Sequence, residues 1–263
     1  MSRLEIQSQQ AANFDRAARA IGAASERTGI DFDYLMNQAK VESGFRADAK
    51  AATSSATGLF QFTKQTWLAT VKQHGAGHGL GWAADAITPD GDGSYSVADP
   101  TLRSQILDLR NQPELASLMA AEFASDNRDV LGTALGRDPQ SVDLYLAHFL
   151  GVGGASKFLQ AWDADPNQAA APLFPKAAAA NQAIFYGKNG APRSLNDIRQ
   201  GFAAKMGGDF APPQQMRTQF AVAARQKALP PLQLQGIQPM PERLSIDFAR
   251  AAYGRLSALG GQG

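Results

Sequence analysis

A single acidic residue, Glu42, falls on the apolar face of a helix predicted over residues 31–43, and this placement limits how the chain can fold. If Asp31 caps the helix, apolar residues recur at helical spacing, and Glu42 follows Leu35 by seven residues on the same face. The carboxyl group is therefore expected to point inward. The negative end of the helix dipole and partial burial both favour its neutral form, which a general acid needs.

The composition favours one helical domain followed by a tail. The 263 residues are 44% apolar, which is enough for a sizeable core. Segments with β character are sparse and short, at 58–62 and 183–186, so we predict a mainly α fold. Residues 1–210 are assigned to this domain. Residues 211–263, rich in Pro and Gln, are assigned to a tail that ends in a short amphipathic helix over 244–256.

Capping residues, prolines and glycines predict where the helices begin and end. The segment PDGDGSY at 89–95 is interpreted as a turn rather than a calcium loop, because Asp90 has no glutamate at the twelfth position. Two further helices are expected early in the chain, over 9–28 before Gly29 and from Thr63 through Val71. Prolines are expected to open three more, at Asp99-Pro100, at Gln112-Pro113 and at Asp138-Pro139, the last of which ends at Gly151 to Gly154. The final helices are expected over 155–162, 175–183 and 194–206, and the last begins with a capping box of Ser194 and Asp197.

Charge and residue content argue against several kinds of partner. A net charge of +1 gives no sign of the basic surface that nucleic-acid binding requires. The absence of Cys excludes disulfides and thiolate metal sites. No run approaches the roughly 18 apolar residues of a transmembrane helix. The first 20 residues lack the apolar middle of a secretory signal, so we expect that the protein is cytoplasmic, that it leaves by another route, or that a leader was removed from this chain. We interpret His74 and His78 as surface residues rather than metal ligands, and we predict no cofactor.

Separated motifs in this chain resemble those of a known family. They are Glu42-Ser43-Gly44-Phe45, then Ser55-Ala56-Thr57-Gly58-Leu59-Phe60-Gln61-Phe62 with Thr66-Trp67-Leu68, and a less clean helix end at Gly151-Val152-Gly153. In this order they resemble the SLT-type lytic transglycosylases, relatives of goose-type lysozyme, over roughly residues 24–154. The resemblance implies a lysozyme-like catalytic domain with extra C-terminal helices, whose substrate is peptidoglycan.

The resemblance also implies roles for single residues. Glu42 matches the catalytic acid and base, Ser43 the adjacent serine, and Gly58 and Gln61 the substrate-groove motif. We expect Ser43 and Gln61 to hydrogen-bond the N-acetyl and amide groups of the substrate.

The third motif offers two candidate neighbours for Glu42. Aligning its glycines puts His148 where the family has a tyrosine, and Tyr145 lies one helical turn earlier. Because positions three apart share a helix face, either side chain could donate to the Glu42 carboxylate or contact substrate. Tyr145 is preferred, because a phenol is the group that the family uses.

The count of acids near Glu42 separates the possible reactions. Cleaving a β-1,4 glycosidic bond needs a proton donor, and most glycosidases add a second carboxylate. After Glu42 the sequence offers only Asp48 before Asp85. One carboxylate fits the mechanism implied by the resemblance, in which the substrate's N-acetyl group assists departure and Glu42 then deprotonates the 6-hydroxyl, giving 1,6-anhydromuramic acid.

Two alternatives remain open. One is a hydrolytic muramidase acting on the same bond. The other is a non-catalytic wall-binding protein, or an assembly protein of a secretion system, flagellum or phage that binds a partner through its tail. The departures from the family pattern at His148 and Phe149 motivate the second alternative. A peptidoglycan substrate would place the enzyme in the periplasm or outside the cell.

Overall fold

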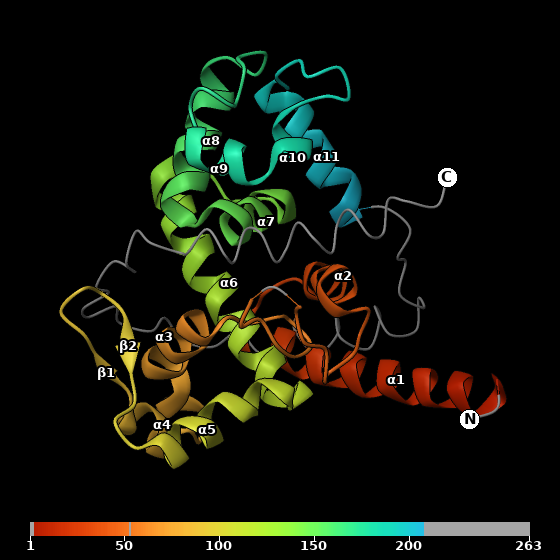
Figure 1. Cartoon of the computed structure of the whole chain (residues 1–263), viewed down its shortest axis with the longest axis vertical. Helices are drawn as coiled ribbons and strands as arrows, with labels where there is room; N and C mark the ends of the chain where they lie inside the picture. Colours follow the sequence, from red (N-terminus) through yellow and green to blue (C-terminus); the bar gives the residue numbers. More distant parts are fainter. Residues whose placement is uncertain (1–2, 53, 208–263) are drawn as a thin grey trace.

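The computed structural model describes residues 3–52 and 54–207, and within these ranges the chain is mainly helical, as predicted (Figure 1). The predicted tail over 211–263 lies outside the described residues. The elements are α1 (Arg3–Thr28), α2 (Phe32–Ser43), α3 (Lys64–His74), the 3-10 helix η1 (Gly75–His78), α4 (Gly81–Ala86), β1 (Thr88–Pro89), β2 (Tyr95–Ser96), α5 (Pro100–Asp108), the 3-10 helix η2 (Leu109–Asn111), α6 (Pro113–Leu135), α7 (Ser141–Leu150), α8 (Val152–Ala164), α9 (Pro175–Ala180), α10 (Gln182–Phe185) and α11 (Leu195–Gly207).

Helix α6 runs through the middle of the molecule and links two groups of helices (Figure 1). α1 packs along α6, and α3, α4 and α5 gather around the same end. Helices α7 to α11 gather around the other end. α2 lies between the two groups and contacts α1, α6 and α11. This position brings the end of α2 close to the second group of helices.

Several predicted helix starts are confirmed by their caps. The side chain of Asp31 accepts a hydrogen bond from the N–H of the third residue of α2, and Thr63 and Asp99 do the same in the first turns of α3 and α5. At α11, Ser194 and Asp197 form the predicted capping box, because each side chain accepts from the other's backbone N–H at 3.1 and 3.0 Å. These local signals fix the ends of the helices that surround the site.

Other boundaries differ from the prediction for identifiable reasons. α7 begins at Ser141 rather than at Pro139, because Gln140 and Asp143 form a capping box at its start. Gly151, with φ of +75°, ends α7 as predicted and directly precedes α8, whereas Gly153 and Gly154 lie inside α8. α1 begins at Arg3, six residues earlier than predicted.

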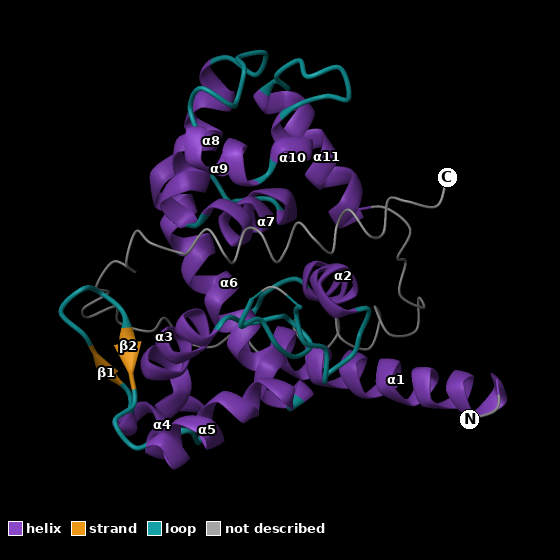
Figure 2. Cartoon of the chain, viewed as in Figure 1, coloured by secondary structure: helices purple, strands orange, loops and turns teal. Residues whose placement is uncertain are grey.

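The strand predictions were wrong in position. Among the described residues the paired strands are β1 and β2, an antiparallel hairpin that encloses the predicted turn (Figure 2). Asp90 holds this turn, accepting hydrogen bonds from the hydroxyls of Ser94 and Ser96 at 3.1 and 2.8 Å. Residues 183–185 instead lie in α10, and 58–62 form a tight turn closed by a bridge from Thr57.

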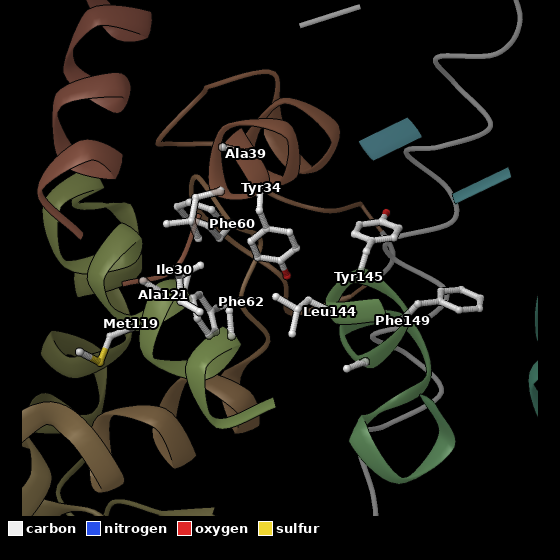
Figure 3. Packing of buried hydrophobic residues seen from close by; sticks show 14 of the residues in the cluster. Ile30, Tyr34, Ala39, Phe60, Phe62, Met119, Ala121, Leu144, Tyr145 and Phe149 are labelled. Atoms are coloured by element: carbon white, nitrogen blue, oxygen red, sulfur yellow. The ribbon is translucent and has the colours of Figure 1, made fainter. Parts of the chain in front are cut away.

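One continuous apolar core supports both groups of helices. Its largest member, Trp67, is fully buried, and its indole N–H donates to the carbonyl of Ile106 at 2.8 Å. Figure 3 shows Phe60 and Phe62 between α2 and α6, and Tyr145 and Phe149 on α7. None of the helices in residues 3–207 that the structure describes combines the length and the apolar character needed to cross a membrane.

Candidate active site

Glu42 lies in the last turn of α2, and only 2% of the residue is exposed, so its side chain points inward as predicted. Its Oε1 lies 3.1 Å from Nε2 of His148 on α7. His148 is also buried. The pair therefore joins the ends of two helices across the core.

Tyr145 lies one turn before His148 and stacks against its ring. The two ring centroids are 5.8 Å apart and the rings are inclined by 25°. The structure thus brings both candidate neighbours to the site, with His148 in hydrogen-bond contact with Glu42 although Tyr145 was preferred. Contact of either side chain with substrate stays a prediction.

Gln38 is a member of the site that the sequence analysis missed. Its Nε2 lies 3.1 Å from Nδ1 of His148. The His148 ring therefore lies between Gln38 and Glu42, with one ring nitrogen facing each of these side chains. Gln38 precedes Glu42 by four residues on the same face of α2, and this spacing could have identified it.

Tyr34 completes the polar face of α2, eight residues before Glu42. Figure 3 shows its ring extending from α2 toward α7. Burial, and then the negative charge of Glu42, raise the pKa of Tyr34. Tyr34 therefore stays a neutral phenol beside the pair.

Ser43 ties the end of α2 to the loop that follows it. Its Oγ lies 3.1 Å from the carbonyl of Ala39 and 2.8 Å from that of Leu59. The hydroxyl proton is thus directed at backbone oxygens. The observed role of Ser43 is to position the loop next to Glu42, and the expected contact with the N-acetyl group stays a prediction.

Gln61 also holds this loop. Its Nε2 donates to the carbonyls of Ala49 and Gly58, both at 2.8 Å, and only 1% of the residue is exposed. Gln61 itself has φ of +49°, an unusual value for a residue with a side chain. The amide hydrogens that were expected to contact substrate bind the protein's own backbone, and a substrate contact stays a prediction.

Gly58 is required because the backbone of Arg110 approaches it closely. A Cβ at position 58 would lie 2.0 Å from the Arg110 carbonyl oxygen, and the φ of Gly58 is +87°. The Arg110 guanidinium donates to the carbonyls of Ser55 and Phe62 at 2.8 and 3.1 Å. Burial lowers the pKa of Arg110. Arg110, which the sequence analysis missed, therefore contacts the loop of residues 55–62, called the motif loop below, through both its backbone and its side chain.

The cavities near and far from Glu42 differ in size and lining. A cavity of about 10 Å³ beside Gln38 and His148 has room for one water molecule at most. A much larger hollow of about 1070 Å³ lies along α9, α10 and residues 186–193. Its lining includes Lys188 and Arg193 but no carboxylate. It therefore lacks the acid that glycosidic cleavage requires.

His74 and His78 are not the surface residues that were predicted. His74 Nε2 lies 2.8 Å from Asp126, and His78 Nε2 lies 2.6 Å from Glu122, so both bind carboxylates of α6. Their side chains are 19% and 11% exposed. Within the described ranges no group of three or more His, Asp or Glu residues has an arrangement that could hold a metal ion. These contacts join α3 and η1 to α6.

The fold and the site together define a mainly helical protein with a buried carboxyl and imidazole pair between two helices. Residues 19–90 match the model of the family described as Transglycosylase SLT domain. This segment of the chain is therefore similar to the SLT domain, which is consistent with the SLT-type lytic transglycosylases of the lysozyme-like superfamily. The matched segment includes Glu42, Ser43, Gly58 and Gln61, whereas His148 lies beyond it.

Proposed function

We propose that this protein is a peptidoglycan lytic transglycosylase. It cleaves the β-1,4 bond between N-acetylmuramic acid and N-acetylglucosamine and forms 1,6-anhydromuramic acid, with Glu42 as general acid and base. The SLT domain supports the class of substrate. The observation that carries the proposal is the buried Glu42 carboxyl, whose Oε1 lies 3.1 Å from Nε2 of the His148 imidazole.

The state of the other buried acid supports a mechanism with one carboxylate. Among the described residues, Glu42 and Asp143 are the acids with buried side chains. Asp143 lies 2.8 Å from Arg137 and 2.9 Å from Arg199. Its charge is therefore compensated, whereas Asp48 is exposed. A second carboxylate acting as nucleophile or base is not needed if the substrate supplies its own N-acetyl group.

The reaction then follows from one carboxyl that changes its protonation state twice. Neutral Glu42 gives its proton to the leaving glycosidic oxygen while the N-acetyl carbonyl oxygen bonds to the anomeric carbon. Glu42, now a carboxylate, accepts the proton of the muramic 6-hydroxyl. The 6-oxygen bonds to the anomeric carbon, the bond to the N-acetyl oxygen breaks, and Glu42 is neutral again. Water takes no part.

Mass spectrometry of products from purified sacculi tests the proposal. The chain is expected to release muropeptides lighter by one water than reducing-end products, and folded Glu42→Gln is expected to release almost none. Asp48→Asn is the matched control, since it removes an exposed acid six residues away. Reducing-end products would identify a hydrolytic muramidase. Sedimentation with sacculi and no soluble product would identify a wall-binding protein.

The substrate also implies where the protein acts. Peptidoglycan places the activity in the periplasm or outside the cell, so we propose that the protein is exported. We also propose that residues 211–263, outside the described part of the chain, bind a partner in a secretion system, flagellum or phage particle. Co-purification of a partner with the full chain and its loss on deletion of 211–263 would support this role, and retention after the deletion would exclude it.

A further inference from the structure

Two residues of α2, one turn apart, hold both nitrogens of the His148 imidazole. Gln38 lies 3.1 Å from Nδ1 and Glu42 lies 3.1 Å from Nε2. We propose that Gln38 keeps His148 neutral, and that it thereby preserves Glu42 as a carboxylic acid able to give up a proton. Gln38 is then a positioning residue that acts through His148. Its kinetic consequence rests on the proposed function, but the state of the ring does not.

The orientation of the Gln38 amide determines which form of His148 is favoured. The side chain presents its NH2 group to Nδ1, so that nitrogen must accept. An imidazolium carries hydrogens on both nitrogens and would place two donors face to face. The other end of the amide, Oε1, is buried and has no hydrogen-bond partner in the part of the chain that the structure describes. The observed orientation therefore disfavours a charged ring.

Several side chains next to the ring are uncharged. From α2 the ring contacts Gln38 and Glu42, and Tyr145 of its own helix stacks on it. On the side of the small cavity, α3 contributes Thr66, and the other neighbours from α6 and the motif loop are Ala120, Phe60, Phe62 and Phe123. Lys205 of α11 lies over the ring of Phe202, which packs against Tyr145, and burial, followed by the charge of Arg193, lowers the pKa of Lys205.

A neutral neighbour matters because Glu42 must begin the reaction protonated. A cation at 3.1 Å would stabilise the carboxylate form of Glu42, so that Glu42 would have no proton to donate near neutral pH. A neutral imidazole still orients the carboxyl through its hydrogen bond but adds no positive charge. In this arrangement His148 fixes the position of Glu42 while Gln38 prevents an ion pair.

Nitrogen NMR of the full chain labelled at its histidines tests the proposal without any substrate. The chain has three histidines, and His74→Asn and His78→Asn assign the other two signals. Between pH 6 and 8 the parent is expected to show a protonated Nε2 and a bare Nδ1 on His148. Gln38→Glu offers Nδ1 an acceptor and is expected to give a doubly protonated ring. A protonated Nδ1 in the parent would overturn the proposal, and this result decides even if the variant does not fold.

The pH profile of activity is the second readout. Gln38→Glu is expected to move the loss of activity that follows Glu42 ionisation at least one pH unit lower, which is about a tenfold loss near pH 7. Gln38→Met, which removes the amide donor and acceptor, is expected to shift the pH at which this activity is lost by less than half as much. A uniform loss at every pH in both variants would mean that Gln38 only packs, and would overturn the proposal. If the NMR result is as expected but no glycan is cleaved, the proposed function fails and this inference stands.

Discussion

Two acids are buried in the part of the chain that the structure describes, Glu42 at the end of α2 and Asp143 at the start of α7, and they are held in opposite ways. Asp143 accepts hydrogen bonds from two guanidinium groups and from the backbone N–H of Gln140. Glu42 lies at the C-terminal end of its helix, where the dipole disfavours an anion, and its partner on α7 is an imidazole. One acid therefore contacts two guanidinium groups, whereas the other contacts an imidazole.

The difference indicates that burial alone does not identify a catalytic acid. A buried carboxylate with full compensation contributes to folding, because taking it out of water is offset by its partners. A buried carboxyl without a cation is costly to ionise and is therefore suited to proton transfer. The following variants test whether the two acids have these separate roles.

Glu42→Gln is expected to have the largest effect. A general acid contributes roughly 10² to 10⁴ in rate, so release of muropeptides should fall by about that factor. The fold should persist, because an amide of the same shape replaces the carboxyl group. Muropeptide release per mole of folded protein is the measurement. Activity within about threefold of the parent would contradict the role of Glu42.

Asp143→Asn should affect stability instead. Removing one partner from a buried ionic group costs about 3 to 5 kcal/mol, and here two guanidinium groups lose the negative charge that they share. Denaturant unfolding should show this loss, while the rate per folded molecule stays within about threefold. A large change in rate at unchanged stability would place Asp143 in the chemistry and break the comparison.

Gly58→Ala tests the loop that lies against Glu42. The added methyl group would meet the Arg110 carbonyl at 2.0 Å in a backbone conformation that alanine disfavours. Strain of this kind costs about 2 kcal/mol. Gly29→Ala, at a similar positive φ but with no atom within 4 Å, is the matched control and should cost about 1 kcal/mol. Equal losses of unfolding free energy in the two variants would show that contact with Arg110 adds nothing.

Asp126→Asn should have the smallest effect, and this effect depends on pH. Burial lowers the pKa of His74, but the hydrogen bond and charge of Asp126 and the charge of Glu122 outweigh it and raise the pKa. Because the folded pKa is raised, the contribution is fully present below the ordinary histidine pKa of about 6.5 and is lost as pH rises through the folded value.

The variant should therefore lower the free energy of unfolding by about 1 kcal/mol at pH 5.5 and by less at pH 9. Asp129→Asn, on the exposed side of α6, is the control and should change little at either pH. A loss that grows with pH would have the wrong sign and would contradict the assigned role of His74.

The sequence identified what is local and missed what depends on distant segments. The caps at Asp31, Thr63 and Ser194 could be predicted because each bond closes within three residues. The inward position of Glu42 followed from the spacing of apolar residues. The choice between His148 and Tyr145 depends on how α7 lies against α2, and neighbouring residues do not specify it. The carboxylate partners of His74 and His78 come from α6, more than 40 residues away.

The double contact between Arg110 and the motif loop constrains how the length of this chain can vary among related sequences. The carbonyl of Ile106 accepts a hydrogen bond from Trp67, and the carbonyl of Arg110 lies against Gly58. The position of η2 along the chain is therefore fixed relative to the loop beside Glu42. An insertion between residues 106 and 110 would move one contact away from the other. The hairpin of β1 and β2 has no such constraint on its exposed turn. We therefore expect relatives with this site to differ in length at 90–94 and to keep the spacing from 106 to 110 unchanged.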